Sequence, residues 1–120
     1  KEASSAPSVT IIATGSEVGI ALDAQIALEA EGVSTRVVSA PCLEWFNEQP
    51  SSYRESVLPA SSLRVSIEAG IALGWREYVG DTGVIISLDH WGASASAAKL
   101  FTEFGLTSER VVADVKKALA

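Results

Sequence analysis

The sequence has a single cysteine, Cys42, and a single histidine, His90. One cysteine cannot form an internal disulfide, which fits a reducing cytoplasm. A zinc site made of cysteine and histidine alone is excluded, because such a site needs more of these ligands than the chain contains. A Cys-His or Ser-His catalytic group would have to use His90.

Positive charge and long apolar runs are also scarce. Nine Lys and Arg stand against fifteen Asp and Glu, which gives a net charge of −6. This balance argues against a nucleic-acid partner and against docking on an anionic membrane, since both require clustered cations. No apolar run approaches the roughly 18 residues of a membrane-spanning helix. The start, KEASSAPSV, has no apolar signal-peptide core, so we expect a cytoplasmic protein.

Composition divides the chain into two parts. Residues 1–8 are rich in Ser, Ala and Pro and predict a linker or a disordered N-terminal end. Residues 9–120 have a length typical of one domain, and 48% of the chain is apolar, which is enough for one core.

Strand and helix signals alternate along residues 9–120. Short runs rich in β-branched residues predict buried strands, and periodic apolar segments predict helices. The predicted strands cover residues 9–13, 35–39, 63–69 and 84–88, and the predicted helices cover 16–31, a short segment after 52, 72–79, a segment from 94 to 105, and a last one after 107. Helices between strands indicate parallel, right-handed crossovers. We therefore expect an α/β fold, a three-layer α/β/α sandwich with a mostly parallel sheet.

Polar residues predict where several of these helices begin. Thr14 with Glu17, and Ser52 with Glu55, have the spacing of a capping box. Thr107 is predicted to cap the last helix, whose Val111, Val112, Val115 and Leu119 would share one apolar face.

The stretch TIIATGSEVGIALDAQ (10–25) is the first candidate site. It runs from a predicted strand through a glycine turn into a predicted helix, as phosphate-binding loops do. It lacks the glycine spacing of GxGxxG and the lysine of a Walker loop, and a capped turn explains each of its residues. Thr14, Gly15 and Ser16 remain candidate anion-binding residues at a helix N-terminus, where Glu17 would compete with the anion.

Two further candidates lie near the carboxyl ends of predicted strands, where open α/β sheets place ligands. Glu68 is a candidate acid or base, and the alternative is a carboxylate bonded to neighbouring backbone. His90 follows the fourth strand in DHWGAS, and the alternative is a packed loop, because the chain has no GxSxG elbow for a nucleophilic serine.

Tryptophan is enriched at protein interfaces, and this small chain has three. Trp75 and Trp91 are therefore candidate interface residues, with ordinary core packing as the alternative. Cys42 has no basic neighbour in sequence to lower its pKa and is expected to be a small packed thiol.

Five stretches of this sequence, taken in order, resemble the C-terminal domain of the transketolase family of thiamine-diphosphate enzymes. They are TIIATGSEV, EGVSTRVVSAP, YRESVLP, IEAGIALGWREYVG and WGASASAAKLFTEFGLT. The resemblance runs from about Val9 to Leu119. The sequence departs from the family at Ala93 and Ser96, where many members have Glu and Pro, and this makes a chemical role for that loop less expected.

The resemblance implies a homodimeric enzyme with three domains per chain. Such an enzyme transfers a two-carbon ketol unit between sugar phosphates, using thiamine diphosphate and a divalent metal such as Mg²⁺. The family holds cofactor and substrate in its two upstream domains, and the GDG metal motif and the SRQ arginine are not in this sequence. No catalytic, cofactor-binding or metal-binding residue is therefore expected here, and the chain is expected to be a fragment or separate domain with the upstream domains and a second subunit as partners.

Three hypotheses follow. In the first, the domain is inactive alone and serves packing and dimer assembly. In the second, it is a regulatory module that binds an anion or nucleotide at the Thr14–Glu17 turn or at the strand ends near Glu68 and His90. In the third, it is a self-associating interaction domain.

Overall fold

The computed structural model describes residues 1–14, 17–39, 46–68, 76–80, 82–87 and 107–119. In this part of the chain, four strands form one sheet in the order β2-β1-β3-β4, and all neighbouring strands are parallel. The strands are β1 (Val9–Ala13), β2 (Thr35–Ser39), β3 (Leu63–Glu68) and β4 (Val84–Ser87). The four predicted strands and their parallel pairing are thereby confirmed.

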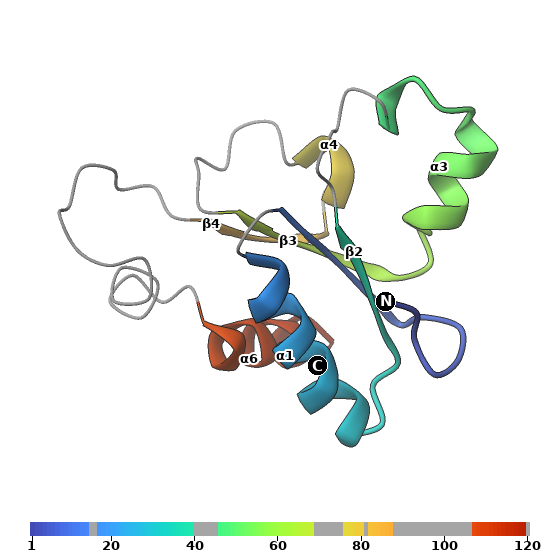
Figure 1. Ribbon diagram of the computed structural model, residues 1–120. Coiled ribbons are helices and arrows are strands. Elements are labelled where there is room, and N and C mark those ends of the chain that lie inside the picture. Colours follow the sequence, from blue (N-terminus) through green and yellow to red (C-terminus); the bar gives the residue numbers. More distant parts are fainter. Residues whose placement is uncertain (15–16, 40–45, 69–75, 81, 88–106, 120) are drawn as a thin grey trace, which may run out of the picture.

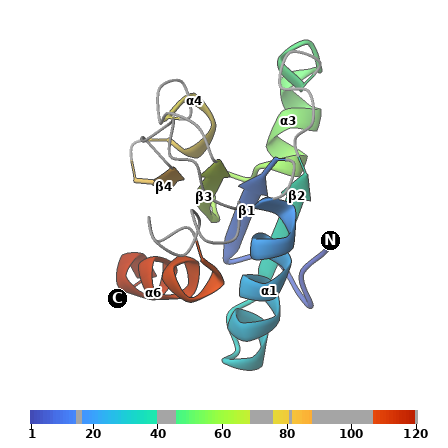
Figure 2. The same cartoon turned by 60° about the vertical axis from the view of Figure 1, so that its left-hand side comes forward.

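Helices cover both faces of the sheet, which confirms the predicted three-layer α/β/α architecture. Figures 1 and 2 show α1 (Glu17–Ala30) and α6 (Ser108–Leu119) on one side of the sheet. They show α3 (Ser51–Val57) and α4 (Arg76–Val79) on the other side. The helices that follow β1 and β3 in the chain, α1 and α4, thus lie on opposite faces of the sheet, although the two strands are neighbours.

Strand β1 is inaccessible along its whole length, because it lies between β2 and β3 and between two helical layers. Its five residues are at most 1% exposed. Ile11 belongs to the larger core cluster with α1 and α6, whereas Ile12 belongs to the smaller cluster with Leu58, Tyr78 and Val79. Burial on both faces explains why the strand is a continuous apolar run rather than an alternating one.

The capping box predicted at Ser52 and Glu55 is wrong. Helix α3 begins at Ser51 with Pro50 as its N-cap residue, and no side chain caps it. Proline fixes its own φ near the value found before a helix, so the helix starts earlier and Ser52 lies inside its first turn. The Glu55 carboxylate instead accepts a hydrogen bond of 2.9 Å from the backbone N–H of Ala60, beyond the C-terminal end.

The start of α6 agrees with the prediction. The Thr107 hydroxyl oxygen accepts a bond of 3.3 Å from the Arg110 backbone N–H. Val111 and Val115 are fully buried, whereas Leu119, predicted to share their face, is the last residue of the helix and is 46% exposed. The Lys116 ammonium lies 2.8 Å from a Glu31 carboxylate oxygen, which joins α6 to the end of α1.

Other predicted features lie outside the described residues. These are Ala69 and Leu88 at the ends of two strands, residues 72–75 of a predicted helix, the helix from Ser94 to Gly105, and Cys42.

Two glycines give a matched test of backbone conformation. Gly80 follows α4 with a φ of +76°, and a Cβ there would lie 2.7 Å from Nη2 of Arg64. We expect Gly80→Ala to lower the free energy of unfolding by about 1–2 kcal/mol, because a left-handed backbone is strained in an L-residue. Gly19→Ala in α1 would place a Cβ in open space and should raise the free energy of unfolding by roughly 0.4–1 kcal/mol. Urea unfolding of both variants measures these changes, and equal effects would contradict the expectation.

Candidate functional site

The carboxyl ends of β1 and β3 bring two predicted site residues to the same edge of the sheet. Ala13 pairs with Ile67, so Thr14 and Glu68 continue from neighbouring positions on adjacent strands. Since the helices that follow these strands, α1 and α4, lie on opposite faces, this edge is a topological switch point, where open α/β sheets place ligands. Of the other predicted site residues, Gly15, Ser16, Trp75, His90 and Trp91 lie outside the described residues.

The turn after β1 is closed by a backbone hydrogen bond, and the capping box expected from the side chains of Thr14 and Glu17 stays a prediction. The Glu17 backbone N–H donates to the Thr14 carbonyl oxygen at 3.1 Å, and Glu17 is only 4% exposed. Both residues take part in further interactions, so a ligand could bind to either residue only by replacing one of these interactions. An anion site at Thr14 stays a prediction, as does a role for Glu68.

The described residues also bear on metals and membranes. Within them, no group of three or more His, Cys, Asp or Glu side chains could hold a metal ion. Among the helices built from those same residues, none has the length and apolarity needed to cross a membrane.

The N-terminal residues predicted as a linker or disordered end form no helix or strand, yet they are bonded to the sheet layer. The Val37 backbone N–H donates to the Lys1 carbonyl at 2.8 Å, and the main-chain nitrogen of Lys1 donates to the Val37 carbonyl at 2.6 Å. The Ser34 hydroxyl donates to the Ala6 carbonyl at 2.6 Å. Residues 1–6 therefore run along β2 and α1.

Glu29 of α1 fixes this N-terminal segment. Its carboxylate accepts bonds from the Ser4 hydroxyl at 2.6 Å, from the Ser4 backbone N–H at 3.1 Å and from the Thr35 backbone N–H at 2.9 Å. The Ser4 hydroxyl, and then the Thr35 N–H, hold the pKa of Glu29 below its ordinary value. Sequence reasoning missed Glu29, because its partner Ser4 lies 25 positions away in a segment with no periodic pattern.

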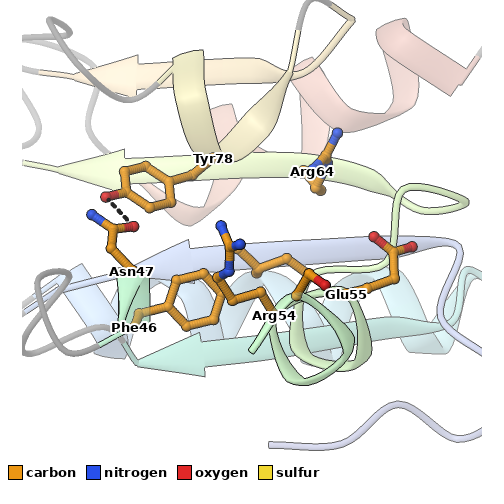
Figure 3. Close-up of a pocket in the computed structure, with 8 residues that line it drawn as sticks. Phe46, Asn47, Arg54, Glu55, Arg64 and Tyr78 are labelled. Carbon is orange, nitrogen blue, oxygen red and sulfur yellow. Dashed lines mark hydrogen bonds between the residues drawn. The ribbon is translucent and has the colours of Figure 1, made fainter. Parts of the chain in front are cut away.

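A pocket of about 240 Å³ opens on the side of the sheet covered by α3 and α4 (Figure 3). Its lining residues are Phe46, Asn47, Ser51, Arg54, Glu55, Leu58, Arg64 and Tyr78. The Tyr78 hydroxyl donates to the Asn47 side-chain oxygen at 3.1 Å, and the Tyr78 ring lies 6.3 Å from that of Phe46, tilted by 51°. No sequence motif points to this pocket, because its residues come from four separate segments.

The bonds of Glu29 predict a pH dependence of stability. A carboxyl whose pKa is lower in the folded state stabilises it above the ordinary value of 4.5, and this stabilisation is lost as the pH falls through the folded-state pKa. We expect Glu29→Gln to lower the free energy of unfolding at pH 7 and to flatten its fall at acid pH. Urea unfolding across this pH range measures both effects. Glu48→Gln, at an exposed position, is the control, and identical pH profiles for the two variants would refute the expectation.

Comparison with known proteins gives one family. Residues 1–107 match the family model described as the transketolase-like C-terminal domain. The chain is 52% identical over 114 residues to a transketolase of Mycobacterium tuberculosis, covering 94% of this chain and 16% of the relative. It is 49% identical over 120 residues to transketolase 1 of Escherichia coli, covering 99% of this chain and 18% of the relative.

Solved structures agree with the sequence relatives. A transketolase from Leishmania mexicana superposes with a TM-score of 0.85 at 42% identity, over 93% of this chain and 16% of that one. A transketolase from Pichia stipitis superposes with a TM-score of 0.87 at 34% identity, over 98% of this chain and 17% of that one. The chain therefore spans about a sixth of the length of these relatives.

None of these matches supports the hypothesis of a regulatory module with an anion or nucleotide site at the strand ends. The matched family model, the identity of about half to whole transketolases and the shared fold all point the same way. The chain belongs to the transketolase family and corresponds to its C-terminal domain.

Proposed function

We propose that the protein to which this chain belongs transfers a two-carbon ketol unit between sugar phosphates, with thiamine diphosphate and Mg²⁺ held by its upstream domains. The observation that carries this proposal is the 52% identity to a transketolase along 94% of the chain. Solved Pichia stipitis transketolases were obtained with sedoheptulose 7-phosphate, xylulose 5-phosphate and fructose 6-phosphate, which supports the substrate class.

Within such an enzyme, this domain has a structural role and no catalytic group of its own. The polar side chains that are buried or bridge elements support this role, because they join parts of the fold to one another. The Gln25 amide donates to the Thr35 carbonyl at 2.8 Å and the Glu2 carbonyl at 3.2 Å, and Arg36 donates to the Ser56 carbonyl at 2.7 Å. The partners are the upstream domains and a second subunit, in a cytoplasmic homodimer.

The proposed absence of a catalytic group in this domain is tested with the pure chain. We expect no ketol transfer from xylulose 5-phosphate to ribose 5-phosphate and no thiamine diphosphate binding, because the domain lacks the groups that hold cofactor and substrate. A coupled spectrophotometric assay and titration calorimetry measure the two quantities. The Mycobacterium tuberculosis transketolase, assayed alongside, is the positive control. Turnover that stays with the chain through purification would overturn the proposed role.

The assembly role needs a separate measurement on the whole enzyme. We expect the parent protein without this domain to dissociate to monomers at concentrations where the intact protein stays dimeric, because the domain supplies part of the packing between subunits. Sedimentation velocity over a concentration series measures the difference. Equal dimer fractions for the two proteins would refute a part in assembly while leaving the proposed activity intact.

A further inference from the structure

The pocket between α3 and α4 gathers positive charge on a chain whose net charge is −6. Arg54 reaches it from α3 and Arg64 from β3 (Figure 3). Within the described parts of the chain, neither guanidinium forms a hydrogen bond or an ion pair. Two other arginines whose side chains the structure describes differ, since Arg36 pairs with Glu2 and bonds backbone carbonyls, and Arg110 pairs with Asp114.

A neutral donor accompanies the two guanidinium groups. It does not come from Asn47, whose side-chain oxygen accepts the Tyr78 hydroxyl and whose amide nitrogen lies on the side away from Arg54 (Figure 3). The Ser51 hydroxyl also lines the pocket and has no hydrogen bond in the described structure. The pocket thus offers donors from α3 and β3 and is suited to a group rich in acceptor oxygens.

One carboxylate opposes this charge. Glu55 lines the pocket at the end away from Asn47 and Tyr78, and one of its oxygens accepts the Ala60 backbone N–H at 2.9 Å (Figure 3). Among the described lining residues, two guanidinium groups against one carboxylate leave one net positive charge. The charge therefore favours an anion, and removal of the carboxylate should favour it more.

The size of the pocket narrows the class of anion. Its volume of about 240 Å³ is below the roughly 300–1,000 Å³ of sites for drug-sized ligands. A phosphate group with a few attached carbons is of suitable size, and its tetrahedral oxygens match the planar forks of guanidinium groups. The aromatic rings of Phe46 and Tyr78 provide an apolar wall beside the donors.

We infer that this pocket binds a phosphate group, either free phosphate or the phosphate of a small ester, through Arg54 and Arg64. The site lies over a face of the sheet and not at the strand ends. It goes beyond the proposed function, because it requires neither the cofactor nor the upstream domains, and its failure would leave that function unaffected.

Amide NMR of the 120-residue chain tests the inference, with inorganic phosphate and glycerol 3-phosphate as probes at constant ionic strength. We expect saturable shifts gathered at the amides of Asn47, Ser51, Arg54, Arg64 and Tyr78. Tighter binding of glycerol 3-phosphate would identify an ester as the preferred source, and equal binding would identify free phosphate. Shifts that do not saturate with either probe would overturn the inference.

Three charge variants sharpen the test. Arg54→Gln on the exposed side of α3 keeps the fold and should weaken binding about tenfold, because it removes a charge-assisted hydrogen bond. Arg110→Gln on α6 removes the same charge on the other side of the sheet and should leave the affinity unchanged. Glu55→Gln keeps an oxygen for the Ala60 N–H and should tighten binding several-fold. Equal affinities in all three variants would show non-specific binding and overturn the site.

Discussion

The burial of β1 on both faces and both edges is the constraint from which the rest of the architecture follows. A strand with no exposed face requires a helical layer on each side, and a strand with no free edge requires a neighbour on each side. Ile11 is packed under α1 and α6, and Ile12 is packed under the opposite layer. Burial of each such side chain stabilises the fold by roughly 1.5–3 kcal/mol. The helices that follow β1 and β3 supply one layer each, and the edge between the two strands is the switch point beside Thr14.

Much of this fold could be predicted from local sequence, because parallel strands buried on both faces are continuous runs of β-branched residues. The run at Val9–Ala13 is the clearest case. Local spacing failed at Ser52, where Pro50 sets the helix start and overrides the hydroxyl cap. The role of Glu29 could not be predicted, because its hydrogen bonds join segments distant in sequence. The pocket at Arg54 could not be predicted either, because no spacing rule connects residues of α3 with the start of β3.

The polar groups of this domain serve two purposes on its two sides. On the side of α1, Glu29 and Gln25 bond the N-terminal segment to β2, and Lys116 joins α6 to α1. On the side of α3, the arginines of the pocket have no hydrogen-bond or ion-pair partner among the residues that the structure describes. The polar side chains near α1 thus stabilise the fold, whereas Arg54 and Arg64 on the opposite side are the ones that we infer to bind phosphate.

The backbone pairing of Lys1 with Val37 has a consequence for the behaviour of the domain in concentrated solution. Strand β2 is at the edge of the sheet, and an edge strand with free N–H and C=O groups is a template for the strand of another molecule. The N-terminal residues occupy part of that edge, so they protect against strand-by-strand aggregation. A version of the domain trimmed to begin at its first strand would lose this protection, and its solubility would depend on residues that add almost nothing to its core.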